Sequence, residues 1–308
     1  MQSLAAPIRS GNRFWIQNEA VVMGGLGVLC FSFTFPATHV AVGAFGGVVV
    51  GLGRAVVAAV LAAIILLVRR EPLPPRHTWP GLVFVALGVV IGFPLLSAVA
   101  LEGATVAHSA VINGLLPAAT AIVAVGLTKE RPSPLFWITC AVGTVAVLLF
   151  AFVQGGGHFH AGDWWMVGAI CAGAVGYAEG GRLARALGGW RVICWALVFA
   201  FPFTATPVVW NVAQRGLHGD LIAWEGLVYV SVFSMLLGFF AWYHGLAKGG
   251  IARISQLQLL QPLLTIGWAA LFLGESLSWL TGVTALFVVL CVAVGQRARA
   301  QPVSQPAS

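Results

Sequence analysis

The stretch Gly249–Glu275, GGIARISQLQLLQPLLTIGWAALFLGE, is an apolar run with a proline near its middle, and an earlier part of the chain carries the same pattern. Placing Pro262 over Pro117 sets an offset of 145 residues (262 minus 117) between the two copies. At this offset three more pairs of markers come into register, namely Asn113 with Gln258, Thr120 with Thr265, and Glu130 with Glu275. Duplicated apolar units with interrupted helices are typical of secondary transporters, so the duplication predicts a repeat architecture of that kind.

The composition places the chain in a membrane. Of its 308 residues, 59% are hydrophobic and only 8% are charged, whereas soluble proteins carry about 25% charged residues. Long apolar runs approach the ~20 residues with which a helix crosses a bilayer. Runs such as Ala55–Val68 and Gly282–Gly295 do not alternate in hydropathy, as the strands of an outer-membrane barrel do. The chain is therefore predicted to be an all-α integral membrane protein.

Ten transmembrane helices are predicted, separated by short gaps that carry proline and glycine. They are expected over residues 20–42, 45–68, 79–101, 105–128, 134–153, 164–187, 191–211, 222–247, 250–273 and 276–295. Because each half contains an odd number of helices, the halves enter the membrane from opposite sides and form two inverted five-helix repeats. The predicted boundaries are 1–155 for the first repeat, 156–295 for the second, and 296–308 for a disordered cytoplasmic tail.

The positive charges predict the orientation of the helices. Of the 16 lysines and arginines, one lies inside the second span, at Arg54, and one, Arg215, lies on the side that also carries most of the acidic residues. The other fourteen lie on the opposite side, at Arg9, Arg13, Arg69, Arg70, Arg76, Lys129, Arg131, Arg182, Arg185, Arg191, Lys248, Arg253, Arg297 and Arg299. By the positive-inside rule, both termini are predicted to be cytoplasmic in a multi-pass protein of the bacterial inner membrane. The net charge of +7 is thus attributed to orientation, and no nucleic-acid partner is expected.

A short loop, His158-Phe-His-Ala-Gly-Asp163, contains residue types found in metal sites and in enzymes. Two histidines and an aspartate can ligate a metal, and the spacing His-x4-Asp occurs in some glycerolipid acyltransferases. The loop has no further ligand or acid near it in the sequence, so neither interpretation is favoured. The sequence also lacks a Gly-x-Ser-x-Gly elbow, a Walker loop and an HExxH motif. We therefore expect no enzyme activity, no metal and no cofactor.

Three parts of the chain together resemble the drug/metabolite transporter superfamily, in particular its EamA-type members with ten helices. They are Ala104–Pro117 (ATVAHSAVINGLLP) with Glu130, residues 249–262 with Glu275, and Arg54 in the run GLGRAVVAAVLAA. The resemblance covers essentially the whole chain, and within the superfamily the chain looks most like the YddG-type exporters of aromatic amino acids.

The resemblance implies a central cavity lined by spans one, three, four, six, eight and nine, with spans five and ten at the periphery. It implies a secondary transporter that exports small metabolites by alternating access, with amino acids that bear aromatic or large apolar side chains as the expected substrates. Efflux of drugs or of other metabolites is the alternative within the superfamily. An enzyme embedded in the membrane is the alternative from another class, and the lack of a catalytic constellation disfavours it.

An amphipathic zwitterion needs hydrogen-bonding groups at one end of its site and an apolar or aromatic wall at the other. Helical spacing places Phe31, Thr34, Phe35 and Thr38 on one face of span one and Phe239, Trp242 and Tyr243 on one face of span eight. The candidate substrate-binding residues are Asn113, Gln258, Ser255, Thr38, His108, Phe35, Phe93, Trp242 and Tyr243. The alternative is that each polar group only joins neighbouring helices, at about 0.6 kcal/mol each.

Pro117, Pro262 and Pro94 are expected to kink their helices, because a proline removes one backbone hydrogen bond. Carbonyls freed in this way are tolerated at membrane depth beside a cavity that is lined by protein or filled with water. The three prolines are therefore candidate gating residues, and a passive kink is the alternative.

Arg54 is the most costly residue to bury, because an arginine inside the bilayer costs at least ~3 kcal/mol unless it is paired or reaches the interface. Two roles are open for it: a structural one, in which it bonds helix-end carbonyls, and the binding of a substrate carboxylate. No Asp or Glu lies at the centre of a span, which leaves His39, His108 and His244 as candidates for proton coupling. Uniport and proton antiport are both compatible with the sequence.

Overall fold

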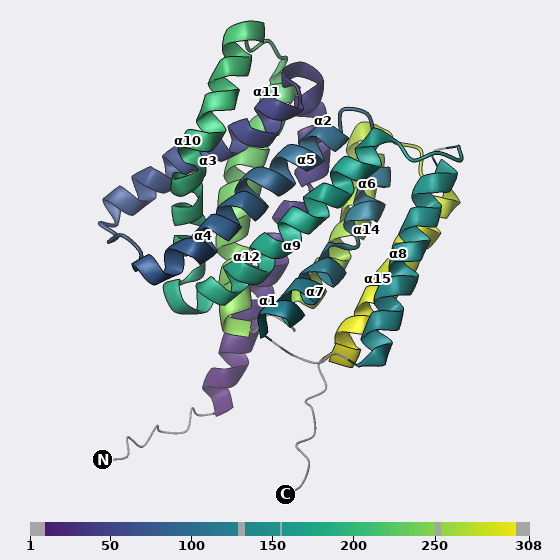
Figure 1. Ribbon diagram of the computed structural model, residues 1–308, viewed down its shortest axis with the longest axis horizontal. Helices are drawn as coiled ribbons and strands as arrows, with labels where there is room; N and C mark the ends of the chain where they lie inside the picture. The colour runs from purple at the N-terminus through teal and green to yellow at the C-terminus, as the bar shows by residue number, and fades with distance from the viewer. Residues whose placement is uncertain (1–9, 129–132, 155, 250–253, 300–308) are drawn as a thin grey trace, which may run out of the picture.

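The computed structural model describes residues 10–128, 133–154, 156–249 and 254–299, and within these ranges the chain forms helices and no strand. Glu130, one of the markers of the repeat, lies outside the described residues, as does the side chain of Ser255. The helices stand side by side in a bundle (Figure 1). The prediction of an all-α membrane protein built from two repeats is confirmed.

The first repeat forms five helical columns, three of which are interrupted. They are span one, α1 (Ser10–Ser32) and α2 (Thr34–Phe45); span two, α3 (Gly47–Val68); span three, η1 (Arg76–Thr78), α4 (Trp79–Val85), η2 (Ala86–Gly92) and α5 (Phe93–Ala100); span four, α6 (Val106–Asn113) and α7 (Leu116–Thr128); and span five, α8 (Pro134–Gln154).

The second repeat forms the other five columns. They are span six, α9 (Ala161–Leu187); span seven, α10 (Gly189–Arg215); span eight, α11 (Leu221–Val228), η3 (Tyr229–Gly238) and α12 (Phe239–Gly249); span nine, η4 (Ser255–Leu260) and α14 (Gln261–Leu273); and span ten, α15 (Trp279–Arg299). Span ten thus continues as helix through residues 296–299, the first part of the predicted tail.

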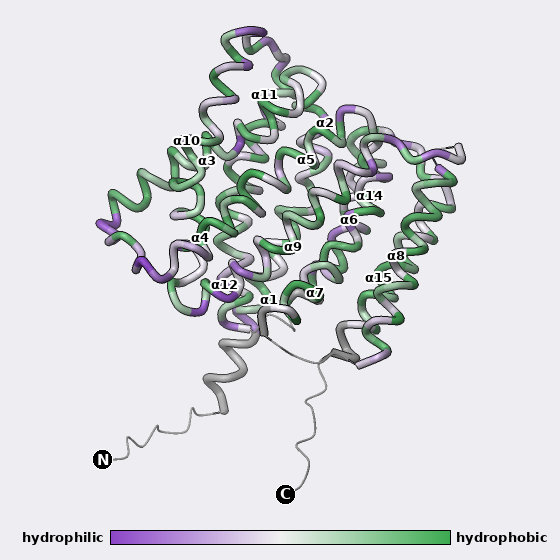
Figure 2. The backbone as a smooth tube through the Cα atoms, viewed as in Figure 1, coloured by the Kyte–Doolittle hydropathy of each residue, from purple (hydrophilic) through white to green (hydrophobic). Residues whose placement is uncertain are grey.

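Most of these columns have the length and composition of membrane spans. Among the described residues, 7 helical stretches are long and apolar enough to cross a bilayer, and the segments Leu257–Leu273 and Trp279–Gly295 are shorter apolar helices. The remaining column, α9, carries charged residues near both of its ends. Apolar residues fill the middle of the bundle and polar ones gather at its two ends (Figure 2).

Spans five and ten lie at one side of the bundle. In Figure 1, α8 and α15 stand next to each other at the right edge, and they pack chiefly on one another. Only 28% of the apolar window in α8 is buried, compared with 67% in the span Val106–Gly126. The other spans, with α9 running through their midst, therefore form the core of the bundle.

Ser10 and Arg299, the first and last described residues, lie at the same end of the bundle, which we call the terminal end (Figure 1). The opposite end, which we call the far end, contains the turns that join spans one to two, three to four and five to six. At the terminal end Glu71 accepts two hydrogen bonds from Arg191, both of 2.8 Å. These bonds hold the pKa of the Glu71 carboxyl below its usual value.

Spans three and eight contain wide turns at equivalent places. Adding the offset of 145 to η2 (Ala86–Gly92) gives residues 231–237, which lie inside η3 (Tyr229–Gly238), and both segments are π-helical. Pro94 follows η2, but Phe239 occupies the equivalent place after η3, so a proline alone does not explain these turns. π turns often lie at functional sites. The two equivalent π turns therefore indicate that the space between spans three and eight is a candidate functional site.

Two helices touch through their backbones at Gly88 and Gly176. A methyl group added to Gly88 would lie 2.6 Å from the carbonyl oxygen of Ala172 and 2.7 Å from the backbone nitrogen of Gly176. Both distances are shorter than van der Waals contact, so only glycine permits η2 and α9 to lie this close. Small residues of this kind let membrane helices approach each other closely.

We predict that Gly88→Ala destabilises the folded protein, because the added methyl group must push η2 away from α9. Overpacking of this kind costs typically 1–3 kcal/mol, so the melting temperature of the purified protein in detergent should fall by several degrees. The matched control is Gly25→Ala in α1, where an added methyl group meets nothing within 4 Å. Equal melting temperatures for the two variants would contradict the prediction.

Candidate functional site

Span one is broken at Phe33, between α1 and α2, and side chains from the second repeat satisfy the backbone there. The carbonyl oxygen of Ser32 accepts a hydrogen bond of 2.7 Å from the Thr265 hydroxyl. The carbonyl oxygen of Cys30 accepts one of 3.0 Å from the Tyr229 hydroxyl. Because a bilayer offers no water to such groups, these bonds are what makes a broken helix possible at this depth.

Side-chain bonds at the same break join the two repeats further. The indole nitrogen of Trp268 donates to the Ser32 hydroxyl at 2.9 Å, and the hydroxyls of Thr34 and Ser234 lie 2.8 Å apart in a buried hydrogen bond. Ser234 belongs to the π-helical segment η3. The break in span one is therefore held by spans eight and nine together.

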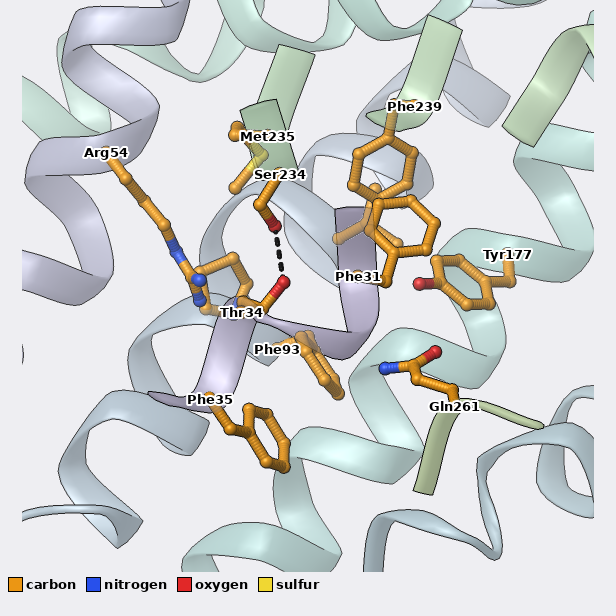
Figure 3. A pocket seen from close by; sticks show the side chains of 12 residues that line it. Phe31, Thr34, Phe35, Arg54, Phe93, Tyr177, Ser234, Met235, Phe239 and Gln261 are labelled. Atoms are coloured by element: carbon orange, nitrogen blue, oxygen red, sulfur yellow. Dashed lines mark hydrogen bonds between the residues drawn. The ribbon is translucent and has the colours of Figure 1, made fainter. Parts of the chain in front are cut away.

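A cavity lies beside this break (Figure 3). Its lining residues come from spans one, two, three, six, eight and nine, and are Phe31, Thr34, Phe35, Arg54, Val89, Phe93, Pro94, Tyr177, Ser234, Met235, Phe239 and Gln261. Its volume is about 20 Å³, which is room for about one water molecule. A molecule of amino-acid size therefore fits only after the walls move apart.

Five of the twelve residues that line this cavity carry aromatic rings. The ring centroids of Phe31 and Phe239 lie 4.9 Å apart, and those of Tyr177 and Phe239 lie 5.9 Å apart. Phe35 and Phe93 are stacked at 6.4 Å with an angle of 18° between their planes. These distances are those of favourable aromatic pairs, so the rings close the cavity by packing on one another.

Arg54 provides the cationic group of the cavity. Its side chain is only 2% exposed, and neither Nε nor Nη2 has a hydrogen-bond partner among the described residues. In Figure 3 the guanidinium approaches from one side, while Tyr177 and Gln261 approach from the other. Among the ion pairs of the described residues, none includes Arg54.

Several other buried polar atoms also lack a partner among the described residues. They are Thr38 Oγ1, His39 Nδ1, Asn113 Oδ1, Trp242 Nε1, Gln258 Nε2 and Gln261 Oε1. Leaving a buried polar group unsatisfied costs about 1–3 kcal/mol. Gln261 lines the cavity directly, whereas Gln258 is not among the lining residues.

The residues predicted for the site fall into separate groups in the structure. Phe35, Phe93, Pro94 and Arg54 line the cavity. Trp242 is 1% exposed and lies behind the lining, where its ring is 6.2 Å from that of Phe31 and 6.2 Å from that of Tyr177.

Tyr243 lies deeper still. It is 0% exposed, and its hydroxyl donates to the carbonyl oxygen of Gly176 in α9 at 3.3 Å. A methyl group on Gly189, at the start of α10, would lie 2.8 Å from its Cβ. In this conformation Tyr243 therefore packs between spans six, seven and eight.

The paired amides lie near a crossing of the two broken helices of spans four and nine. A methyl group on Gly114, the residue after Asn113, would lie 3.5 Å from Pro262, so the break of span four faces the start of α14. Asn113 and Gln258 are buried there, at 4% and 2% exposure. Pro117 lies in the first turn of α7, just past the same break.

The histidines lie away from the cavity. His108 Nε2 lies 2.7 Å from Asp163 Oδ1 at the far end, so the acid of the His158–Asp163 loop does have a partner, from span four. His244 and Lys248 share Glu19, at 2.9 and 2.7 Å, at the terminal end.

Five lining residues were not singled out from the sequence. They are Val89, Tyr177, Ser234, Met235 and Gln261. Gln261 directly precedes Pro262, so its place at a helix break was visible in the sequence. Ser234 is the counterpart of Val89 at the offset of 145, and both line the cavity.

In a comparison with known proteins, the model of one family matches this chain twice, once in each half. The model of the EamA-like transporter family matches residues 18–152 and again residues 160–294. The chain is 45% identical over 282 residues to the uncharacterized transporter YdeK of Bacillus subtilis (strain 168), covering 90% of this chain and 96% of that one. It is 23% identical over 264 residues to the uncharacterized transporter sll0355 of Synechocystis sp., covering 78% of each.

A solved crystal structure has a similar fold. It aligns with a TM-score of 0.64 at 17% sequence identity, over 90% of this chain and 96% of that one.

We predict that Thr265→Val destabilises the protein, because it leaves the buried carbonyl of Ser32 without its partner. The expected loss in the free energy of unfolding is about 1–3 kcal/mol, measured by thermal or denaturant unfolding in detergent. Thr144→Val is the matched control, since the Thr144 hydroxyl bonds a carbonyl of its own helix and is exposed. If both variants lose equally little stability, the bond from Thr265 does not hold the break.

Proposed function

Because this chain belongs to the EamA-like transporter family, we propose that it exports a small carboxylate-bearing metabolite with an aromatic or large apolar part. The simplest such substrates are aromatic amino acids, as in the YddG-type exporters that the sequence resembles. Export is proposed to proceed by alternating access across the bacterial inner membrane. The direction of transport follows from that resemblance.

The observation that carries the proposal is the buried guanidinium of Arg54, two of whose nitrogens lack a hydrogen-bond partner among the described residues. An ionisable group inside a membrane bundle ordinarily has a partner, and it marks a functional site when the protein does not supply one. Nε and Nη2 of Arg54 are free of partners among the described residues, and the side chain borders the cavity. A planar carboxylate matches the fork of donors on a guanidinium.

The remainder of the cavity suits the other parts of an amino acid. The rings of Phe31, Phe93 and Phe239 can pack against an aromatic side chain. The unpartnered amide oxygen of Gln261 can accept a hydrogen bond from an ammonium group. Asn113 and Gln258 lie behind the cavity lining, at the crossing of spans four and nine. We propose that they form hydrogen bonds with the substrate when the walls of the cavity move apart.

The charge of Arg54 also separates this proposal from its main alternative. A hydrophobic cation, the usual form of an exported drug, would meet an uncompensated positive charge in a desolvated site, and like charges repel strongly there. A zwitterion or an anion meets attraction instead. The site therefore favours metabolites with a carboxylate over cationic drugs.

We predict that Arg54→Gln weakens binding of phenylalanine by one to two decades, since a hydrogen bond to a charged group is worth about 1.5–3 kcal/mol. Uptake of radiolabelled phenylalanine by reconstituted liposomes measures this loss. Phenethylamine, which lacks the carboxylate, should compete poorly with phenylalanine in the unsubstituted protein.

Arg215→Gln is the control for this experiment, because Arg215 is an exposed arginine at the end of α10. It should transport at the unsubstituted rate. Each variant is first shown to be monodisperse in detergent, so that a folding defect is recognised. Unchanged phenylalanine transport by a folded Arg54→Gln protein would remove Arg54 from the site.

The distribution of charge supports cytoplasmic termini. The described lysines and arginines in the turns and helix ends of the terminal end are Arg13, Arg69, Arg70, Arg76, Arg182, Arg185, Arg191, Lys248, Arg297 and Arg299. At the far end only Arg215 accompanies the acidic residues Glu102, Asp163, Asp220, Glu225 and Glu275 among the described part of the chain. We therefore propose that the terminal end faces the cytoplasm.

We predict that a cysteine placed at the exposed His158 reacts with an impermeant maleimide added outside spheroplasts. A cysteine placed at the exposed Arg185, at the opposite end of α9, should react only after permeabilisation. The unsubstituted protein, with its five native cysteines, gives the background. The reverse pattern of labelling would invert the proposed orientation.

A further inference from the structure

His108 and Asp163 form a part-buried pair that the proposed transport site does not use. The imidazole Nε2 lies 2.7 Å from the carboxylate Oδ1, and the two side chains are only 15% and 7% exposed. The imidazole ring stacks on Phe150 of α8 at 5.3 Å, with an angle of 28° between the rings. The pair is therefore fixed from both sides and shielded from most of the surrounding solvent.

The pair joins the two repeats at the far end of the bundle. His108 lies in the first turn of α6, in span four, and Asp163 lies in the first turn of α9, in span six. In Figure 1 these two helices run next to each other. Movement of the two repeats apart at the far end must therefore break this contact.

Asp163 is held in place independently of His108. Its second oxygen, Oδ2, accepts a hydrogen bond of 2.9 Å from the backbone nitrogen of His160, as part of a capping box at the start of α9. A negative charge in the first turn of a helix also interacts favourably with the helix dipole. Substitution of His108 therefore leaves the carboxylate positioned.

The other titratable groups around His108 are few. Glu275 accepts hydrogen bonds from the backbone nitrogens of Val106 and Ala107, at 2.7 and 2.9 Å, and caps the start of α6. On the packed elements, α2 contributes His39, α8 contributes Cys140 and α14 contributes no titratable side chain. In α15 the titratable residues are Cys291 and the arginines at the terminal end.

The remaining neighbours lie beside Asp163 or in the loop before α6. His160 is the capping partner of Asp163, and Glu102 accepts a hydrogen bond from the backbone nitrogen of Gly47. Each carboxylate in this neighbourhood thus has partners of its own. His108, in the first repeat, is the imidazole that contacts the carboxylate of Asp163, in the second repeat.

We propose that the His108–Asp163 pair is a proton-responsive tie that holds the far end of the two repeats closed. When His108 is protonated, the contact is an ion pair with a charge-assisted hydrogen bond, which is roughly twice as strong as a neutral one. When His108 loses its proton, a weaker neutral hydrogen bond remains and the far end opens more readily. Loss of this proton at higher pH therefore makes opening of the far end more frequent.

The inference rests on the proposed function only in that opening of the far end is a step of transport, and it is testable without a substrate. Ser109→Cys places a nearly isosteric thiol beside His108, at a position that is 1% exposed. Its rate of reaction with a maleimide in detergent reports opening of the far end. Dividing by the rate of an Ala161→Cys protein, whose thiol is exposed, removes most of the pH dependence of the maleimide reaction itself.

We expect this normalised rate to rise about fivefold between about pH 5.5 and about pH 8, as the charge-assisted bond is lost. In the His108→Gln background the rise should disappear, because an amide can still bond Asp163 but carries no charge. His158→Gln is the matched control, because His158 is an exposed histidine in the loop that leads to Asp163. This variant should keep the full rise. Background labelling is measured on the protein with only its native cysteines.

A cross-link provides a reference for the closed state. The Cβ of Ala104 lies 3.5 Å from a Cβ built on Gly162, which is within the range for a disulfide. An Ala104→Cys/Gly162→Cys pair should therefore tie the loop before α6 to the start of α9. After oxidation, the thiol introduced by Ser109→Cys should remain unreactive at every pH, and reduction should restore its reactivity.

The proposal is overturned if the normalised rate does not change with pH in the unsubstituted background, or if His108→Gln keeps the same rise. Should His108→Gln not fold, Asp163→Asn decides in its place, since it also removes the ion pair. A pH-dependent rate in a protein that fails to transport phenylalanine would uphold the tie and reject the proposed substrate. Transport of phenylalanine by a protein whose maleimide reaction rate does not change with pH would uphold the proposed substrate and reject the tie.

Discussion

A carbonyl group freed inside a bilayer finds no water to bind, and this constraint decides how the two repeats meet. The break of span one frees the carbonyls of Cys30 and Ser32, which receive hydrogen bonds from Tyr229 and Thr265 of the second repeat. These bonds exist only while spans eight and nine lie against span one. The hydrogen bonds at the break therefore hold the two repeats together. The cavity lies beside the same break.

Much of this fold could be predicted from the sequence, because a membrane imposes strong rules on composition. Apolar length located the spans, and the prolines at 117 and 262 marked the helix breaks of spans four and nine. The break at Phe33 and the π-helical turns η2 and η3 were not predicted. Pro36 has no backbone N–H for the carbonyl of Ser32, four residues before it, and so is a local signal of the break. The hydroxyl groups that bind the carbonyls of Cys30 and Ser32 lie 199 and 233 residues away in the chain, and no local signal marks them. Pro94 follows one π turn, but no proline follows the other, so local sequence does not identify both.

The candidate site was harder to predict for a related reason. Assigning residues to a helix face assumes 3.6 residues in each turn, and a π turn contains more. Span eight carries a π-helical segment directly before Phe239, which turns the regular helix α12 and its aromatic residues as one unit relative to the first half of the span. In the structure Phe239 lines the cavity, whereas Trp242 and Tyr243 lie behind it. The π-helical segment of span eight also carries Ser234 and Met235, which line the cavity as well.

The burial of Arg54 has a consequence for how the chain enters the membrane during synthesis. Span two must partition into lipid before spans three, six and eight exist to surround the arginine. An arginine near the centre of a span opposes insertion by about 2.5 to 3.5 kcal/mol, whereas each Leu, Ile or Val favours it by roughly 0.3 to 0.6 kcal/mol. The helix Gly47–Val68 contains seven valines, four leucines and two isoleucines. Together they outweigh the arginine, so this helix can leave the translocon on its own and carry its charge into the bilayer ahead of the groups that later enclose it.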